Sequence, residues 1–204
     1  MVIRQAQAQD TTAASELIFS SAATLLARMF NVTADLNALG FLTNAFSQQD
    51  GQYGFANHWV IESDDQPVAI ACGWHCELPE VFHRATIQSM TNYYGIEHTL
   101  EVVQRCQVLK SIFTAPQKDD WCIGHFAVSV QHQRQGLGTR LMTQMRELAL
   151  EAGKKNLTLD VESANQAAQL FYQSLGFQMA KKQLAGQQIS GSGIATYSHM
   201  VLPI

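Results

Sequence analysis

The sequence predicts one mixed α/β domain, and two observations support this fold class. Segments with apolar residues at every third or fourth position, typical of helices, alternate with short apolar segments typical of strands. The chain has 204 residues, enough for one large domain and few for two. We therefore expect a single domain over residues 1–204, with a mixed central sheet and flanking helices.

The first half of the chain is expected to be mainly helical around one hairpin. Asp10 and Thr11 are suited to end the first strand and cap the helix that follows. The cluster 64–67 is a turn between two apolar runs, which indicates a β-hairpin. The expected elements are a strand at 2–6, helices at 13–30 and 34–46, hairpin strands at 58–62 and 68–74, and a helical insertion of about 79–116 broken near Gly95.

In the second half, strands and helices alternate. Gly153 and Gly176 are placed to end helices, and Ser163 with Gln166 has the spacing of a capping box. The expected elements are a strand at 121–130, a helix at 139–152, a strand at 157–161, a helix at 163–175, and final strands at 177–183 and 196–202 around a Gly/Ser-rich loop at 186–193.

Charge and hydropathy exclude several classes of protein. Thirteen Lys and Arg against seventeen Asp and Glu give a formal net charge of −4, which disfavours a general nucleic-acid binder because such binding depends on phosphate neutralisation. The first ten residues lack the apolar core of a secretory signal, and no run is long enough to span a bilayer. We therefore expect a cytoplasmic protein that binds neither nucleic acid nor membrane.

The cysteines are expected to be buried free thiols. Cys72, Cys76, Cys106 and Cys122 are scattered and lie mostly in apolar stretches, as in proteins of a reducing compartment. Cys72, Cys76 and His75 could be imagined as zinc ligands, but no second pair lies at zinc-finger spacing. We therefore expect no metal site.

A glycine-rich turn between an apolar strand and a helix is the first functional motif. It reads Gln133-Arg-Gln-Gly136-Leu-Gly138, and Arg140 follows. Such a turn presents backbone N–H groups at a helix N-terminus, where an anion is favoured. Leu141 replaces the third glycine of the dinucleotide fingerprint, and no Gly-Lys-Ser/Thr of a P-loop is present. The motif alone is equally compatible with a phosphate site and with a tight connection.

A second segment favours the phosphate site. It places Asn165, Ala168, Tyr172, Gly176 and Phe177 in succession after the strand at 157–161. Together with the glycine turn, this order and spacing resembles the GCN5-related N-acetyltransferase (GNAT) family. The resemblance covers about 121–177 and implies a central sheet of the N-acetyltransferase type that binds acetyl-coenzyme A.

Carried over position by position, the resemblance implies a splayed pair of parallel strands, 121–130 and 157–161, with acetyl-coenzyme A between them. The backbone of the first strand and Asn165 would bind the pantetheine arm, the 133–139 loop the pyrophosphate, and Tyr172 the sulfur. Val130 departs from the family, because many members have proline there. The implied cofactor-binding residues are Phe126, Val128, Val130, Gln133, Arg134, Gln135, Gly136, Leu137, Gly138, Thr139, Asn165 and Tyr172.

The implied reaction is direct attack of a neutral amine on the thioester, with no acyl-enzyme. Tyr172 is the implied catalytic acid, and a backbone N–H of the first strand, that of Val128 by our expectation, would bind the oxyanion. A thiol of pKa about 8.5 leaves without great difficulty, so losing Tyr172 should slow the reaction rather than abolish it. Asp120, His125, Glu162 and a water chain are alternatives for the general base.

The expected acceptor is a small-molecule or peptide amine, with α-amines slightly favoured. Its specificity is expected to come from 28–34 and from the 79–116 insertion, which could also be a lid, a homodimer surface or plain packing. The alternatives to an acetyltransferase are a regulatory module that binds acyl-coenzyme A without turnover, a transferase of longer acyl groups, and a protein-interaction domain.

Overall fold

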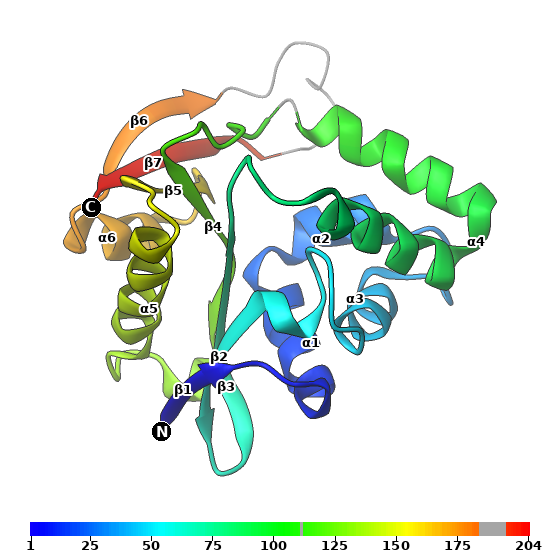
Figure 1. Ribbon diagram of the computed structural model, residues 1–204, viewed down its shortest axis with the longest axis horizontal. Coiled ribbons are helices and arrows are strands. Elements are labelled where there is room, and N and C mark those ends of the chain that lie inside the picture. The colour runs from blue at the N-terminus through cyan, green and yellow to red at the C-terminus, as the bar shows by residue number, and fades with distance from the viewer. Residues whose placement is uncertain (111, 184–194) are drawn as a thin grey trace.

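The computed structural model describes residues 1–110, 112–183 and 195–204, and the expected loop at 186–193 lies outside them. A seven-stranded sheet of order β1-β2-β3-β4-β5-β7-β6 runs through the molecule (Figure 1). Neighbouring strands are antiparallel except β4 and β5, which confirms a mixed sheet. The strands are β1 (Val2–Gln5), β2 (His58–Ser63), β3 (Gln66–Trp74), β4 (Asp120–Val128), β5 (Asn156–Glu162), β6 (Gln178–Gln183) and β7 (Tyr197–Pro203).

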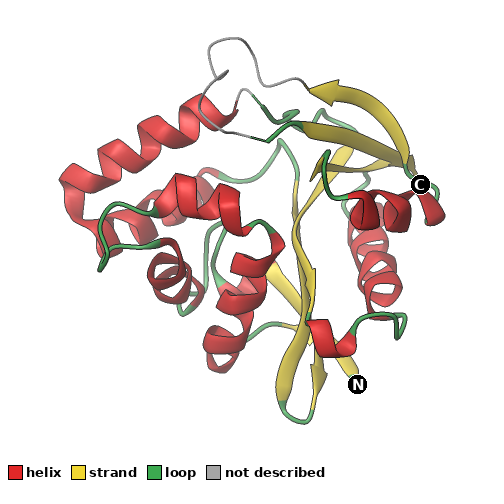
Figure 2. Ribbon diagram, turned by 180° about the vertical axis from the view of Figure 1, so that it is seen from behind, coloured by secondary structure: helices red, strands yellow, loops and turns green. Residues whose placement is uncertain are grey.

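Helices cover both faces of this sheet (Figures 1 and 2). Alternate residues of β2 and β3 serve two separate cores: Val60 and Ile70 pack with α1 to α4, whereas Ile61 and Ala69 pack with α5. This period of two is what a strand buried on both faces requires. The helices are α1 (Thr11–Ser21), α2 (Ala23–Phe30), α3 (Ala38–Phe46), α4 (Glu80–Lys110), α5 (Leu137–Glu151) and α6 (Gln166–Ser174).

Two helix predictions in the first half need correction. The segment predicted as one helix over 13–30 is two helices, because the backbone of Ala22 leaves the helical region at φ −156° and ψ 50°. The helix predicted from residue 34 begins only at Ala38, where the Asn37 side chain accepts a hydrogen bond from the N–H of Gly40 at 3.0 Å. The predicted break in the insertion is confirmed at Gly95, with φ 74° and ψ 174°.

The predicted capping box of Ser163 and Gln166 is wrong. Ser163 is bound to the last strand: its N–H donates to the carbonyl of Thr196 at 2.8 Å, and its hydroxyl lies 2.9 Å from that of Ser198. The cap of α6 is instead Asn165, whose Oδ1 accepts from the N–H of Ala168 at 3.1 Å. The residue that caps the helix is therefore a predicted site residue.

The strand predicted over 121–130 is shorter at its carboxyl end. After Val128, the N–H of Ser129 donates to the carbonyl of Val68 at 2.8 Å, and the chain turns into a short 3₁₀ helix, η3 (Val130–His132). Val130 is 78% exposed and lies outside the strand. Any contact of its backbone with a cofactor would therefore come from this turn rather than from the strand.

No disulfide joins any of the four cysteines, and their burial was predicted only in part. Cys72 and Cys122 are buried and Cys106 is half-buried, as expected for free thiols in apolar segments. Cys76 is exposed, because it follows the end of β3.

Helix α5 offers a test of the second core. Leu141 is fully buried there, whereas Leu150 of the same helix is 51% exposed. Leu141→Ala should lower the free energy of unfolding by about 2–5 kcal/mol, because it removes buried methyl groups and leaves a cavity. Leu150→Ala should change it by roughly 0.5 kcal/mol or less. Urea denaturation measures both, and equal losses would contradict this packing.

Candidate functional site

The central feature of the candidate site is the divergence of β4 and β5. These parallel strands pair over three positions, of which the last is Cys122 with Thr158. Beyond that position β4 continues to Val128, paired with β3, and β5 continues to Glu162, paired with β7. Each strand is therefore held along its outer edge and left without a strand partner along its inner edge. Unpaired backbone groups at such an edge are donors and acceptors for a bound molecule.

A bulge in β4 lies at this opening. From Cys72 to Ile70, β3 advances by two residues, while the paired residues on β4, Gly124 and Ala127, are three apart. The additional residue falls at His125, whose φ of +49° is unusual for a residue with a side chain. Bulges often lie next to functional sites, where they change the direction of a side chain. His125 is therefore a candidate site residue.

The predicted glycine loop forms an open set of donors. Arg134 and Gly136 adopt positive φ values of 58° and 77°, and α5 begins at Leu137 without a side-chain cap. The structure records no hydrogen-bond acceptor for the backbone N–H groups of 134–139 within the described residues. Alternation of such backbone conformations with a free helix N-terminus makes an anion-binding concavity.

The two glycines of the loop have different roles. A side chain at Gly136 would meet no atom within 4 Å, so this glycine is needed for its positive φ and leaves open space. A Cβ at Gly138 would lie 3.0 Å from the ring of Phe171, so this glycine lets α5 approach α6 closely. Only Gly136 faces the space that an anion could enter.

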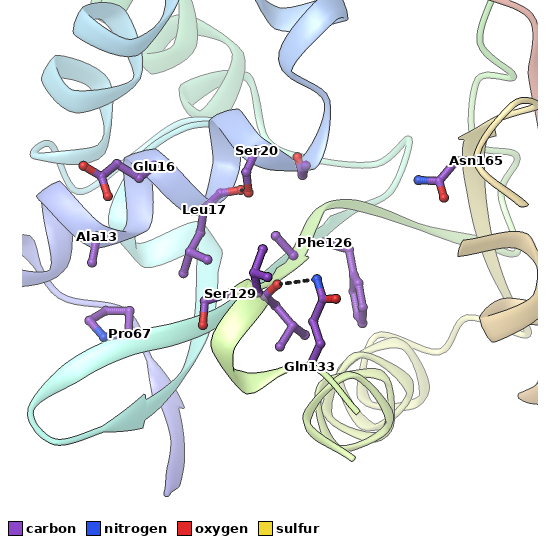
Figure 3. Close-up of a pocket in the computed structure, with 13 residues that line it drawn as sticks. Ala13, Glu16, Leu17, Ser20, Pro67, Phe126, Ser129, Gln133 and Asn165 are labelled. Atoms are coloured by element: carbon purple, nitrogen blue, oxygen red, sulfur yellow. Dashed lines mark hydrogen bonds between the residues drawn. The ribbon is translucent and has the colours of Figure 1, made fainter. Parts of the chain in front are cut away.

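A pocket of about 500 Å³ lies between α1 and the end of β4 (Figure 3). Five of the predicted cofactor-binding residues line it, whereas Glu16, Leu17 and Ser20 of α1 form the opposite wall. The side chain of Gln133 donates to the carbonyl of Val128 at 3.3 Å, which already uses one backbone group of this wall. The five predicted residues are Phe126, Val128, Val130, Gln133 and Asn165.

Asn165 reaches this pocket from the far side of the opening (Figure 3). Its Oδ1 is used in the cap of α6, and the structure records no partner for its Nδ2 among the described residues. The amide can therefore cap the helix and still donate a hydrogen bond into the pocket.

Tyr172 packs across the opening against β4. Its ring lies 6.0 Å from that of Phe126 and 5.7 Å from that of Phe177. Burial raises the pKa of the phenol to about 12, so it stays protonated near neutral pH. Its hydroxyl has no recorded hydrogen-bond partner among the described residues. The hydroxyl oxygen is not one of the fully buried polar atoms that lack a partner, so it reaches solvent.

The structure separates the candidate bases. Asp120 lies at the paired end of β4, where its carboxylate accepts from the N–H of Gln117 at 2.9 Å and from Asn156 Nδ2 at 3.0 Å. Each of its two carboxylate oxygens therefore already accepts a hydrogen bond at the start of the strand. Glu162 is half-buried on β5. His125, by contrast, lies in the bulge itself, with Nδ1 2.9 Å from His58 Nε2.

A carboxylate–imidazole pair on the other side of the opening was missed by sequence reasoning. Asp160 and His199 are paired residues on β5 and β7, and His199 Nδ1 lies 3.1 Å from Asp160 Oδ1. Asp160 Oδ2 also accepts from the N–H of Thr114 at 3.3 Å. Polar residues at alternate positions of β5 could have indicated a polar face that includes Asp160. The strand register that places His199 opposite Asp160 could not be seen in the sequence.

The helical insertion packs mainly on the other helices. The hydroxyl of Tyr94 donates to the carbonyl of Phe30 at 2.6 Å, and that of Tyr93 donates to the carbonyl of Asp35 at 3.1 Å. Arg105 Nη1 donates to the carbonyl of Asn31 at 2.7 Å. The insertion therefore fixes the chain between α2 and α3, next to the predicted acceptor region at 28–34.

Within the described residues, no helix combines the length and apolar character needed to cross a bilayer.

Comparisons with known proteins agree with this geometry. A family model described as the acetyltransferase (GNAT) family matches residues 37–177. An N-acetyltransferase from Staphylococcus aureus Mu50 is 15% identical with a TM-score of 0.70, covering 99% of this chain and 100% of its own. A ribosomal-protein-alanine N-acetyltransferase from Brucella melitensis is 17% identical with a TM-score of 0.60 and full coverage of both chains. A search of curated proteins found no match.

The fold and the matched family model define an acetyltransferase class of protein. The chain belongs to the GNAT family, since the match covers well over half of its length.

The environment of Tyr172 makes a testable prediction. Because burial raises its pKa to about 12, its phenol should remain protonated at pH 10, where a free phenol is half ionised. NMR of ¹³Cζ-labelled tyrosine, with the signal assigned from Tyr172→Phe, measures this directly. Ionisation of the assigned signal near pH 10 would show that the ring is not enclosed as described.

Proposed function

We propose that the protein transfers an acetyl group from acetyl-coenzyme A to an amine. The observation that carries this proposal is the continuity of the β4–β5 opening with the uncapped N-terminus of α5. A thioester on a long arm that ends in a diphosphate needs both features: an extended slot with free backbone groups and an anion site at its end.

The residues present fit this substrate. The open N–H groups of 134–139 would bind the diphosphate, with Arg134 and Arg140 adding positive charge. The unpaired edge of β4 between Gly124 and Val128 would bind the amide groups of the pantetheine arm, opposite Asn165. Val130 would contribute through its exposed side chain rather than through a strand backbone.

The chemical step follows from the groups on either side of the opening. The neutral amine attacks the thioester carbonyl, and a backbone N–H on the free edge of β4 binds the oxygen as it becomes negative; one such donor is typically worth about 3–4 kcal/mol. The carbon–sulfur bond then breaks, and Tyr172 protonates the departing sulfur. The raised pKa of Tyr172 keeps the proton available near neutral pH.

The acceptor is an α-amine or a small-molecule amine in this proposal. The candidates for the base close to the bulge include no free carboxylate on β4, since Asp120 is used structurally. A lysine amine, of pKa about 10.4, is almost wholly protonated at neutral pH, whereas an α-amine, of pKa about 7.7–8.0, is partly neutral. A site with a weak base therefore favours the amine that needs less deprotonation.

Calorimetry with acetyl-coenzyme A tests the proposal, and α5 provides a matched pair of variants. Gly136 and Gly153 lie at its two ends, with φ of 77° and 69° and no atom within 4 Å of an added Cβ. Gly136→Asp should abolish binding, because its carboxylate would repel the diphosphate. Gly153→Asp adds the same charge and a similar backbone strain at positive φ. This variant should bind acetyl-coenzyme A as the wild type does.

Dephosphorylated pantetheine, which lacks the diphosphate, should bind weakly to the wild type. Failure of folded wild-type protein to bind acetyl-coenzyme A would refute the proposal. Binding without thiol release for any amine would instead identify a module that binds acyl-coenzyme A without turnover.

A further inference from the structure

Three side chains on neighbouring strands converge beneath the β4 bulge. His58 begins β2 and is paired with Cys72 on β3, which is paired in turn with Gly124, the residue before His125. His58 and Cys72 are fully buried, and His125 is half-buried. His125 Nδ1 lies 2.9 Å from His58 Nε2 and 3.2 Å from Cys72 Sγ.

The hydrogen bonds determine which ring nitrogens carry protons. His58 Nδ1 lies 2.9 Å from the carbonyl of Gly54, which only accepts, so Nδ1 carries the hydrogen. Burial lowers the pKa of His58 to about 4, so the ring is neutral and its Nε2 holds a lone pair. His125 Nδ1 must then be the donor, because two lone pairs at 2.9 Å would repel.

The carbonyl that starts this chain is held firmly. A Cβ at Gly54 would lie 2.4 Å from the carbonyl oxygen of Asp50, so the loop leaves no room for a side chain at this position. The N–H of Gly54 donates to the carbonyl of Gly51 at 3.2 Å. The partner of His58 Nδ1 is therefore a backbone carbonyl rather than another side chain.

The same cluster is the one set of three metal-ligand residues found among the described parts of the chain, and its geometry argues against a metal. The planes of His58 and His125 differ by 10°, and their centroids are 5.2 Å apart. This separation is what two imidazoles give when they meet end to end through a 2.9 Å N–H···N bond. Two ring nitrogens that face each other in this way do not converge on a third point, as two ligands of tetrahedral zinc must.

The remaining nitrogen of His125 is open. His125 Nε2 has no recorded hydrogen-bond partner among the described residues. It is not one of the fully buried polar atoms that lack a partner, so it reaches solvent. The ring of Tyr53 stacks on the imidazole, with centroids 5.1 Å apart and planes 22° apart, and Trp74 lies at 6.2 Å. Aromatic neighbours thus hold the ring while one nitrogen is left accessible.

We propose that His125 is the general base of the acetyl transfer, and that His58 is a positioning residue which holds His125 in the tautomer with a free lone pair on Nε2. The inference rests on the proposed function. As the amine nitrogen bonds to the carbonyl carbon, its proton passes to His125 Nε2. The carbon–sulfur bond breaks, and the sulfur takes the proton of Tyr172. Both side chains then exchange protons with solvent, so the net transfer is from amine to thiol.

The position of His125 suits this role. Its partners His58 and Tyr53 belong to the face of the sheet covered by α1 to α4, whereas Tyr172 belongs to the core of the α5 and α6 face. The base and the acid would therefore approach the opening from opposite faces of the sheet. Burial, and then His58, hold the pKa of His125 well below its usual value, which keeps the lone pair free. A weak base suffices, because a nitrogen that has attacked a carbonyl is cationic and strongly acidic.

Ring ¹⁵N NMR of histidine-labelled protein tests the tautomers without any substrate. In wild-type protein, His125 should carry its proton on Nδ1 and show a free Nε2. His58→Leu should shift His125 toward the Nε2–H form, because Nδ1 loses its acceptor, and His58→Gln should restore the wild-type form through its side-chain oxygen. A proton on Nε2 in the wild type, or stoichiometric zinc binding that is lost in Cys72→Ala, would overturn the inference.

Kinetics then test the chemistry, with acetyl-coenzyme A and a short peptide bearing a free α-amine. His125→Gln should lower kcat by about 100-fold or more while leaving acetyl-coenzyme A affinity unchanged. His58→Leu should lower kcat with little change in KM, and His58→Gln should recover much of it. His75→Gln is the matched control, because His75 follows the end of β3, is half-buried as His125 is, and lies outside both the 79–116 insertion and the glycine loop.

The outcomes separate this inference from the proposed function. Acetylation that is undiminished in His125→Gln would refute the base and leave the acetyltransferase intact. Loss of acetyl-coenzyme A binding in the wild type would refute the function itself. If the peptide is not acetylated, the tautomer measurement still decides the arrangement of His58 and His125.

Discussion

The structure depends on one constraint: β4 and β5 are paired for three residues and then separate, although each remains paired with another strand, β4 with β3 and β5 with β7. Closing the gap would require breaking the pairing with β3 or β7, so the free inner edges are a stable property of the sheet. Backbone groups left without partners are costly to bury unless something binds them. The pocket, the uncapped start of α5 and the amide of Asn165 all adjoin this opening.

The bulge at His125 connects the opening to the face of the sheet that α1 to α4 cover. One additional residue in β4 interrupts the pairing with β3 and places an imidazole against His58, whose orientation is fixed by the carbonyl of Gly54. Tyr172 occupies the opposite face, where burial keeps it protonated. The same distortion of the strand thus positions backbone donors and an ionisable side chain, while the flanking cores keep the proposed acid and the proposed base on opposite faces of the sheet.

Much of the fold could be predicted from the sequence, because strand and helix periodicities are local properties of the chain. The glycine loop, Asn165 and Tyr172 were predicted as site residues because their order and spacing resemble those of the GNAT family. The break at Ala22 has no glycine or proline to announce it, and the cap at Asn165 replaced a plausible box because Ser163 is bonded to β7. The pairs His58–His125 and Asp160–His199 depend on strand register between residues 67 and 39 positions apart, which no local pattern reveals.

Amide hydrogen exchange tests the central claim most directly, because it reports on the inner edges of β4 and β5 themselves. Without ligand, amides on the inner edges of β4 beyond Cys122 and of β5 beyond Thr158 should exchange faster than those paired with β3 and β7. Saturating acetyl-coenzyme A should protect these inner amides together with those of 134–139. Unchanged exchange at both strands, with protection elsewhere, would contradict the assignment of the opening as the acetyl-coenzyme A site.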